Sequence, residues 1–325
     1  MKAVAFDRHG GVEVLDYRDC PDPQPAQGEV VVRVRATGLN YLDVFARRGM
    51  PGVSIPLPFI SGGDIAGEIA TVGDGVTGWR AGERVVVNPK TKRGLIGEEV
   101  NGGLAERVAV PAENLVRLPE SVSFEDGAAI PIAFGTALRM LTTIGGLKAG
   151  ESILILGASG GVGTACVQIA KMVGARVIAA AGSAEKADKL RALGADEVID
   201  YSRDDFSRAA WDLSGRKGVN VAVNFTGGDT FNPSLRALAR HGRLLVCGAT
   251  AGFSPQIDLR YLWRRELQVL GSTGYTQQDI AAAVAMVASG KLKPVIGRVF
   301  PLRQAAEAVK LLEDRAFFGK IVVIP

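Results

Sequence analysis

The chain has 325 residues, of which 47% are hydrophobic, and a net charge of +4 at neutral pH. A chain of this length usually forms about two domains with sizeable cores. It has no apolar run of the roughly 18 residues that a membrane-spanning helix needs, and its basic residues are interleaved with acidic ones, so we expect no membrane association and no specific nucleic-acid partner.

The amino terminus and the cysteines favour a cytoplasmic protein. The opening sequence MKAVAFDRHG is charged where an export signal would be apolar. Cys20, Cys166 and Cys247 lie far apart, without the spacing of a disulfide framework or a metal site. We therefore expect a reducing, cytoplasmic location.

The first part of the chain, up to about Pro119, has the pattern of short β-strands. Residues 29–36 alternate, with Val30, Val32 and Val34 on one face of the predicted strand. Clusters of proline and glycine separate this strand from the next ones. Further strands are expected at 67–72, 84–88 and 107–110.

From about Phe124 onward, strand and helix patterns alternate, which predicts an α/β domain with a doubly wound parallel sheet and helices on both faces. Strands are expected near 152–156, 176–181, 197–199, 219–224, 243–247 and 267–271. Helices are expected near 162–173, 184–193, 230–240 and 277–289. After about Pro294 the chain returns to the first domain and ends in the apolar strand 320–324. The predicted domains are therefore 1–123 with 294–325, and 124–293.

A glycine-rich turn inside the second domain predicts a dinucleotide site. The apolar run 153–156 is followed by four glycines, at 157, 160, 161 and 163, and then directly by a helical pattern. Ala158 replaces the first glycine of the usual G-x-G-x-x-G motif, but the order strand, turn, helix and second strand is complete. Glycines let the backbone approach a pyrophosphate, and the first N–H groups of the helix face the anion. An ordinary strand-to-helix turn is the alternative.

Several segments together resemble the quinone oxidoreductase branch of the medium-chain dehydrogenase/reductase superfamily. The pattern G-E-x-x-L-x-x-x-A-S-G-G-x-G-x-x-x-x-Q-x-x-K, from Gly150 to Lys171, matches the defining motif of that family. The C-terminal sequence FGKIVV closes the match, so the resemblance covers essentially the whole chain. Other matching segments are 36–49, 58–76, 128–138 and 193–201.

This resemblance implies a fold and an activity. The expected fold is a GroES-like β-barrel catalytic domain interrupted by a Rossmann domain, with the active site in the cleft between them. The expected reaction is hydride transfer from a reduced nicotinamide to a small-molecule acceptor, either a quinone or an α,β-unsaturated carbonyl (enone). Members of the family are usually homodimers or homotetramers.

The resemblance also directs attention to zinc. The zinc alcohol dehydrogenases of the superfamily hold their metal with Cys and His at two positions where this chain has Asn40 and Gly63, the latter followed by Asp64. The segment 88–103, which stands where those enzymes carry a structural zinc, contains no cysteine. Because catalytic zinc needs about three protein ligands, we expect no metal, although Asp64 is a possible ligand for a hard cation.

The resemblance implies four residues near the substrate, each with an alternative role. Asn40 and Asp43 are expected to contact or position substrate, or to cap a helix, with Asp43 pairing Arg47 or Arg48. Tyr41 is a hydrogen-bond donor to a substrate carbonyl or a packed ring, and Thr136 touches the nicotinamide or bonds to its own helix. Solvent is the expected proton source, because no dedicated acid lies in the motifs.

The expected cofactor is NADPH. The strand 176–181 leads into Gly182 and Ser183 without the carboxylate that an NAD-selective site places there. Lys186 resembles the phosphate-contacting lysine of the family, although Ser183 alone predicts only a helix cap and Lys186 is otherwise a solvated side chain. The predicted cofactor-binding residues are Thr136, Ser159, Gly160, Gly161, Val162, Gly163, Gly182, Ser183, Lys186, Tyr201, Asn224 and Gly248.

Two other functions remain open from the sequence. One is an alcohol dehydrogenase of the zinc-containing type with atypical ligands, and the other is a non-catalytic NADPH-binding protein like the lens crystallins of the family. For assembly, the run 267–272 is the expected last strand of the Rossmann sheet, and its pairing with a second copy would give a homodimer.

Overall fold

The computed structural model describes residues 1–50 and 52–325. Contacts divide the chain into two compact units, Met1–Ile132 with Thr276–Pro325, and Ala133–Tyr275. The first unit takes in helices α2 (Phe124–Ala128) and α9 (Gln277–Ala288), which the sequence analysis placed in the second domain. The limits of the functional domains stay a prediction.

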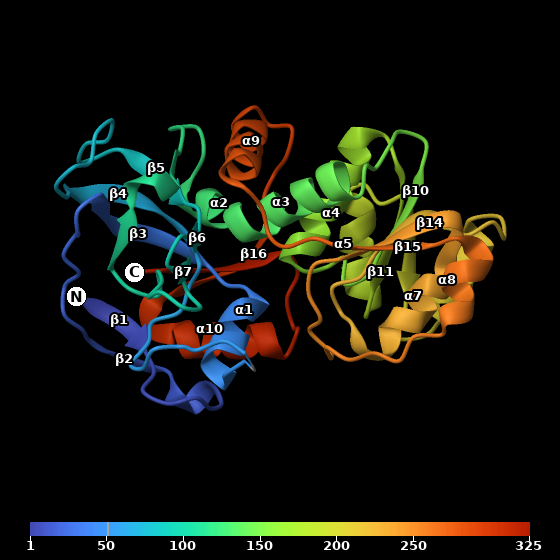
Figure 1. Cartoon of the computed structure of the whole chain (residues 1–325), viewed down its shortest axis with the longest axis horizontal. Coiled ribbons are helices and arrows are strands. Elements are labelled where there is room, and N and C mark those ends of the chain that lie inside the picture. Colours follow the sequence, from blue (N-terminus) through green and yellow to red (C-terminus); the bar gives the residue numbers. More distant parts are fainter. Residues whose placement is uncertain (51) are drawn as a thin grey trace. The chain divides into compact units, whose positions relative to one another are not determined.

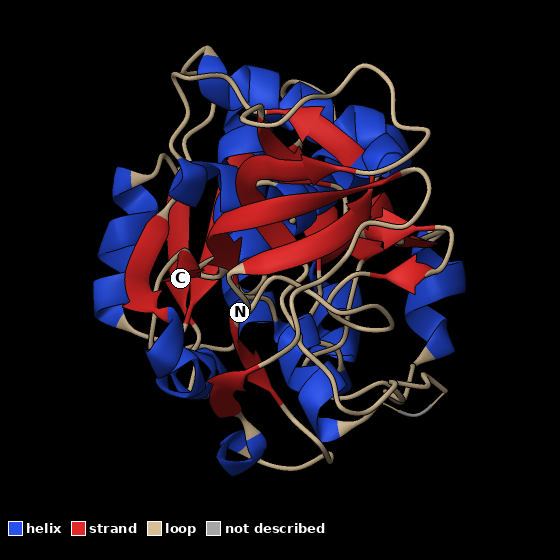
Figure 2. Ribbon diagram, turned by 90° about the vertical axis from the view of Figure 1, so that its left-hand side faces the viewer, coloured by secondary structure: helices blue, strands red, loops and turns tan. Residues whose placement is uncertain are grey.

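The first unit is built around a seven-stranded sheet. Its strands follow the order β16-β17-β3-β4-β5-β9, and β8 pairs with the other side of β3. Figure 2 shows strands of the molecule, in red, curving around one another. These strands are β3 (Glu29–Gly38), β4 (Asp64–Val72), β5 (Arg84–Val87), β8 (Arg107–Pro111), β9 (Leu115–Arg117), β16 (Ile296–Pro301) and β17 (Lys320–Ile324).

The alternation predicted for β3 is confirmed by its packing. Val30, Val32 and Val34 share one buried cluster with Ile65 and Ile69 of β4, because alternate residues of a strand point to the same face. Antiparallel pairing sets Val32 opposite Ile69. In Figure 1 the C-terminal end of the chain, in red, lies among the blue and green strands of this unit, where β17 pairs with both β16 and β3.

Two small sheets and several helices complete the first unit. The small sheets pair β1 (Lys2–Ala5) with β2 (Asp16–Asp19), and β6 (Lys90–Thr91) with β7 (Gly94–Leu95). The longer helices besides α2 and α9 are α1 (Tyr41–Arg48) and α10 (Ala305–Glu313). Single turns of 3-10 helix are η1 (Val12–Val14), η2 (Ala112–Asn114) and η5 (Leu302–Gln304).

The second unit contains a six-stranded parallel sheet. The strand order is β12-β11-β10-β13-β14-β15. The chain adds strands outward from β10 on one side and then, from β13 on, outward on the other side, as in a dinucleotide-binding Rossmann fold. The strands are β10 (Ser152–Ile155), β11 (Arg176–Ala181), β12 (Glu197–Asp200), β13 (Val219–Val223), β14 (Leu238–Val246) and β15 (Gln268–Gly271). The helices are α3 (Pro131–Leu138, which begins in the first unit), the π-helix η3 (Arg139–Ile144), α4 (Gly161–Val173), α5 (Ala184–Ala192), α6 (Phe206–Leu213), the 3-10 turn η4 (Gly228–Thr230), α7 (Phe231–Ala237) and α8 (Leu259–Arg265).

One predicted boundary in this unit is wrong. The helix expected over 230–240 ends at Ala237, because Leu238 is extended, with ψ 144°. Leu238 begins β14 and pairs with Val219 in the sheet, where it is fully buried. Tertiary pairing therefore outweighs the local helical pattern at these residues.

The predicted α/β organisation is confirmed: one unit has a mainly antiparallel seven-stranded sheet, and the other has a doubly wound parallel sheet of the Rossmann type. Across residues 1–50 and 52–325, every helix is too short or too polar to span a lipid bilayer.

Candidate functional site

The glycine turn joins β10 to α4 at the carboxyl edge of the parallel sheet. Gly157 adopts a left-handed conformation, with φ +60°, and Gly160 is the N-cap residue of α4. Gly161, Val162 and Gly163 form the first turn of α4. Their N–H groups point away from the helix and cannot bond to carbonyl groups of α4. Ser159 is a half-buried residue of the preceding turn. These four predicted residues and Gly160 are therefore brought together.

Two of these glycines are required for different physical reasons. A Cβ atom on Gly163 would lie 2.4 Å from the carbonyl oxygen of Gly157, so only glycine lets α4 approach the turn. A Cβ atom on Gly160 would meet only that same oxygen, at 3.7 Å, and would otherwise extend into open space. We call the open space above Gly160, beside the first N–H groups of α4, the glycine cradle. Its size and its N–H groups fit the pyrophosphate of a dinucleotide.

The next two strands bring a second group of predicted residues together. Gly182 and Ser183 follow β11, and Tyr201 follows β12, its N–H bonded to the carbonyl of Ala181 at 2.9 Å. A Cβ atom on Gly182 would lie 2.8 Å from the Tyr201 hydroxyl oxygen. Ser183 caps α5 by accepting the N–H of Lys186 at 3.3 Å, which confirms the predicted cap.

The ends of β14 and β15 border a surface hollow of about 470 Å³. Its lining includes Cys247, Gly271 and Ser272. The Ser272 hydroxyl is buried and, within residues 1–50 and 52–325, has no hydrogen-bond partner. Buried polar groups in native proteins are nearly always bonded, so this enclosed hydroxyl is an exception at the border of the hollow.

Two other predicted cofactor residues lie at the same sheet edge. Asn224 follows β13 and is fully buried; its amide donates to Thr230 and Ser234 and accepts the N–H groups of Thr226 and Gly227. The side chain therefore shapes its own loop. Exposed Gly248 lies beside Phe225. Direct contact of either residue with a cofactor stays a prediction.

Thr136 lies in the middle of α3, 5% exposed. It belongs to the second unit, whereas Asn40, Tyr41 and Asp43 belong to the first.

In the first unit, Asn40, Asp64 and Lys320 form a buried polar cluster. The ammonium of Lys320 donates to Asn40 Oδ1, Asp64 Oδ2 and the Leu39 carbonyl, each at 2.8 Å. Asn40 Nδ2 donates to Asp64 Oδ2 at 2.9 Å, and the Ile132 N–H donates to Asp64 Oδ1 at 2.8 Å. Lys320 is 3% exposed and Asp64 is fully buried, so the pair is shielded from water.

Asp43 supports this cluster from the first turn of α1. Its carboxylate accepts the Asn40 N–H at 2.7 Å, as in a capping box, and the Gly62 N–H at 2.8 Å. Burial raises the pKa of Asp43 to about 7, outweighing these two N–H donors, which lower it. The alternative role as a partner of Arg47 or Arg48 is wrong.

Both of those arginines pair with Glu313 of α10. Arg47 is almost fully buried and bonds to Glu313 through Nη2, while exposed Arg48 reaches the same carboxylate at 2.9 Å. Tyr41, at the start of α1, is half-buried, and its ring packs edge-on against Phe45 with the centroids 5.2 Å apart. The pair Arg47–Glu313 fixes α1 to α10.

The donor set does not suit zinc. In the part of the chain that the structure describes, no three His, Cys, Asp or Glu side chains gather as a metal site would require. Asp64, the one carboxylate considered for a hard cation, is already bound by an ammonium group.

Comparisons with known proteins identify the family to which this chain belongs. Residues 26–120 match the model of the alcohol dehydrogenase GroES-like domain, and residues 161–289 match that of the zinc-binding dehydrogenase family. Human quinone oxidoreductase is 32% identical over 100% of this chain and 98% of its own length. The chain belongs to the quinone oxidoreductase branch of the medium-chain dehydrogenase/reductase superfamily.

Solved structures of this superfamily are similar over nearly the whole chain. One described as an NAD-dependent alcohol dehydrogenase has a TM-score of 0.94 and 39% identity, covering 100% of both chains. The 2-octenoyl-CoA carboxylase reductase CinF, in complex with NADP and 2-octenoyl-CoA, has a TM-score of 0.90 and 28% identity, covering 99% of this chain and 87% of CinF. Members of this superfamily are oxidoreductases that use a nicotinamide cofactor and small-molecule substrates, so this chain is an oxidoreductase.

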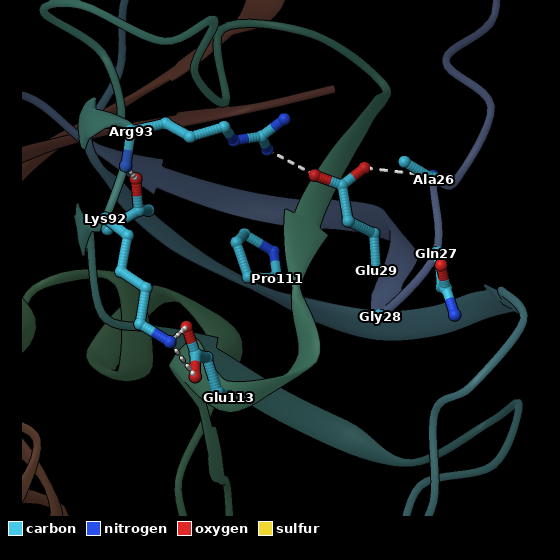
Figure 3. A pocket seen from close by; sticks show the side chains of 9 residues that line it. Ala26, Gln27, Gly28, Glu29, Lys92, Arg93, Pro111 and Glu113 are labelled. Carbon is cyan, nitrogen blue, oxygen red and sulfur yellow. Dashed lines mark hydrogen bonds and ion pairs between the residues drawn. The ribbon is translucent and has the colours of Figure 1, made fainter.

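A second hollow, on the surface of the first unit, is lined by residues that lie outside the sequence segments that resemble the quinone oxidoreductase branch. It measures about 410 Å³, and Figure 3 shows the charged side chains that line it. Arg93 pairs with Glu29, and Lys92 pairs with Glu113 at 3.0 Å. Because these charges satisfy one another, the hollow offers little to a charged ligand.

Sequence reasoning missed two residues of the candidate site. In the sequence, Lys320 is only the first residue of an apolar strand, although a lysine there needs a partner once the strand is buried. Ser272 is only the last residue of the run 267–272. No local sequence pattern indicates that Lys320 binds Asp64 or that the Ser272 hydroxyl is without a partner among the described residues, because both facts follow from burial in the folded chain.

Proposed function

We propose that this chain is a zinc-independent reductase that transfers hydride from NADPH to a quinone or an α,β-unsaturated carbonyl compound. The observation that carries the proposal is the cluster of Asn40, Asp64 and Lys320. The oxygen atoms that a metal would need at Asn40 and Asp64 are bound by the ammonium of Lys320 at 2.8 Å. A divalent cation there would also meet a like charge in a buried site, where repulsion is strong.

The absence of suitable zinc ligands favours activated acceptors. Polarising an unactivated ketone or alcohol depends on a Lewis acid, whereas a conjugated carbonyl or quinone accepts hydride more readily. A bound reduced nicotinamide supplies that hydride. The name of human quinone oxidoreductase and the unsaturated thioester in the CinF complex support this substrate class.

The residues of α1 orient the acceptor in this proposal. The Asn40 amide is already engaged by Gly38, Asp64 and Lys320, so it positions the start of the helix. Tyr41, the next residue, supplies a hydrogen bond to the acceptor oxygen, and Asp43 holds Asn40 in place. In the Rossmann unit, Thr136 orients the nicotinamide ring.

The preference for NADPH rests on the loop after β11. It carries Gly182 and Ser183 where an NAD-selective site has a carboxylate. Glu185, the acid of the first turn of α5, pairs with Lys189 at 2.6 Å. Lys186, in the same turn, is the basic residue proposed for the 2′-phosphate. Tyr201, 47% exposed, borders the same loop. A similar solved structure is described as an NAD-dependent alcohol dehydrogenase, so the ratio of kcat/KM for NADPH to that for NADH is the measurement that tests this preference.

We further propose a cytoplasmic homodimer. Strand β15 is an edge of the parallel sheet, and Val269 on it is 43% exposed. The preceding helix α8 exposes Leu259 by 57% and Trp263 by 62%. An open strand edge beside exposed apolar side chains suits pairing with a second copy. Cys20, Cys166 and Cys247 are free thiols, as in a reducing compartment.

The deciding experiment assays purified protein with both nicotinamides against quinones, enones and alcohols, together with elemental analysis. We expect NADPH-dependent reduction of quinones or enones that chelators do not inhibit. Stoichiometric zinc with chelator-sensitive ethanol oxidation would instead identify an atypical zinc enzyme. Tight NADPH binding without turnover of any acceptor would identify a non-catalytic protein.

A further inference from the structure

Phe225 follows β13 at the point where the chain changes sides in the parallel sheet. β10 and β13 are neighbouring parallel strands, and the other strands are added outward from each of them in opposite directions. In sheets of this kind a dinucleotide binds across the crevice at the carboxyl ends of the two central strands. Phe225 is half-buried, so a large apolar residue stands at this crevice.

The ring of Phe225 lies against the glycine turn. A Cβ atom on Gly157 would be 2.7 Å from Cε2 of the ring, closer than non-bonded carbon atoms approach, so the ring occupies the space that a side chain there would need. The carbonyl oxygen of Gly157 is the atom that a Cβ atom on Gly160 or Gly163 would meet, at 3.7 Å and 2.4 Å. Phe225 therefore touches the residue whose carbonyl borders the glycine cradle.

The backbone of Phe225 holds the loop that follows β14. Its carbonyl oxygen accepts the N–H of Thr250 at 3.1 Å. A Cβ atom on Gly248 would lie 3.8 Å from Cβ and from the carbonyl oxygen of Phe225, an ordinary packing distance. Gly248 follows Cys247, which lines the hollow at the ends of β14 and β15. One residue thus contacts both the glycine turn and the loop that carries Gly248.

These two contacts differ in kind. Backbone bonds join the loop after β13 to the loop after β14: the N–H of Ala251 donates to the Thr226 carbonyl at 2.7 Å, and that of Gly228 donates to the Gly252 carbonyl at 3.0 Å. The contact with the glycine turn is made by the aromatic ring of Phe225. Truncating the ring would therefore keep the bonds between the two loops and remove a support of the glycine turn.

We propose that Phe225 is a positioning residue for the cofactor. Its ring sets the spacing between the glycine cradle and the loop after β14, so that the pyrophosphate and the nicotinamide half are held in one arrangement. The inference rests on the proposed function, because it requires a nicotinamide dinucleotide at this sheet edge. The G-x-G-x-x-G motif describes only the turn after the first strand and gives no sign of this residue.

The test compares Phe225→Ala with Phe225→Leu and with the control Phe206→Ala, using calorimetry to measure the Kd for NADPH. If the loops of Phe225→Ala adopt the binding arrangement about a tenth of the time, this Kd rises about tenfold. Phe225→Leu keeps most of the bulk and should restore most of the affinity. Phe206 is a half-buried residue at the start of α6 that packs on a buried cluster of the same unit, and Phe206→Ala should leave the Kd unchanged.

A fragment of the cofactor provides a readout that a general loss of stability would not produce. Adenosine 2′-monophosphate carries the 2′-phosphate without the pyrophosphate or the nicotinamide, so it should bind Phe225→Ala and the wild type equally. If Phe225→Ala does not fold, Phe225→Val is a smaller truncation that should show the same difference between NADPH and the fragment.

Two results overturn this inference alone: an unchanged Kd for NADPH in the folded Phe225 truncation, or an equal loss of affinity for NADPH and for the fragment. A wild type that binds neither NADPH nor NADH overturns the proposed function itself.

Discussion

Single charged residues in this protein have roles set by what lies around them. Asp43 is a fully buried carboxyl group, and burial raises its pKa to about 7. Its two oxygens accept the backbone N–H groups of Asn40 and Gly62, so it is suited to hold Asn40 in place. The helix-capping role of Asp43 was predicted from the sequence, whereas its burial and its bond to Gly62 depend on the folded unit.

Lys186 tests the cofactor preference at the residue scale. A charge-assisted contact to phosphate is worth about 1.5–3 kcal/mol, so Lys186→Ala should raise the KM for NADPH by about tenfold to a hundredfold. The KM for NADH should be nearly unchanged. Arg191→Ala, which removes an exposed charge from the last turn of the same helix, where it pairs with Asp188, is the control and should alter neither value. Equal effects of Lys186→Ala on both cofactors would contradict the proposed phosphate contact.

Asp43 predicts a pH dependence of stability. Its pKa is raised to about 7 from the ordinary 3.8, so the folded state retains a proton that the unfolded chain has lost between these values. The contribution of Asp43 to the free energy of unfolding therefore falls as the pH rises through this window, and is constant above it. Asp43→Asn should flatten this decline when urea unfolding is compared at about pH 5 and about pH 7.5.

Asp279 provides the control for that measurement. It occupies the same capping-box position in α9 but is half-exposed. Asp279→Asn removes a capping carboxylate in the same position of another helix, and so measures the loss of stability that comes from the cap alone. A slope that is unchanged in Asp43→Asn would show that burial does not perturb Asp43.

At the scale of elements, the turn between β10 and α4 was predicted most fully. Its glycines, its strand and its helix are local features, and the helix expected at 162–173 is observed as Gly161–Val173. The end of α7 was predicted poorly, because the pairing of Leu238 with Val219 is not visible in the local pattern. A helix or strand whose limits follow from its own residues can be predicted from the sequence. One whose limits follow from pairing with a neighbouring strand cannot.

Two alanine variants separate the roles of the glycines in this turn. Gly163→Ala places a methyl group 2.4 Å from the Gly157 carbonyl oxygen and should destabilise the fold by about 1–3 kcal/mol, with loss of cofactor binding. Gly160→Ala points into open space and should cost less than about 1 kcal/mol. It should still weaken NADPH binding, because the methyl group occupies the cradle. Calorimetric binding and urea unfolding measure the two effects, and unimpaired binding by Gly160→Ala would exclude this cradle as the pyrophosphate site.

At the scale of the whole molecule, the open edge of β15 predicts assembly. Val269→Lys adds a charge to the proposed dimer edge and should convert a homodimer to a monomer, because an edge-strand lysine disfavours pairing. Light scattering at micromolar concentration measures the change. Val299→Lys is the control, since Val299 is 47% exposed on β16, an edge strand of the barrel sheet. A wild type that is already monomeric would remove the proposed interface.

The fold class and the glycine turn could be predicted from the sequence, because strand alternation, helical spacing and glycine positions are short-range patterns; the family was predicted from the resemblance of the motif Gly150–Lys171. The chemistry of the buried cluster could not be predicted in this way, because it depends on contacts between distant segments. Lys320 meets Asp64 across 256 residues of sequence, and this contact exists only because β17 and β4 both pair with β3. The Ser272 hydroxyl is likewise buried without a partner among the described residues, which no local pattern records. Propensity acts between neighbours in sequence, whereas burial and charge pairing act between neighbours in space.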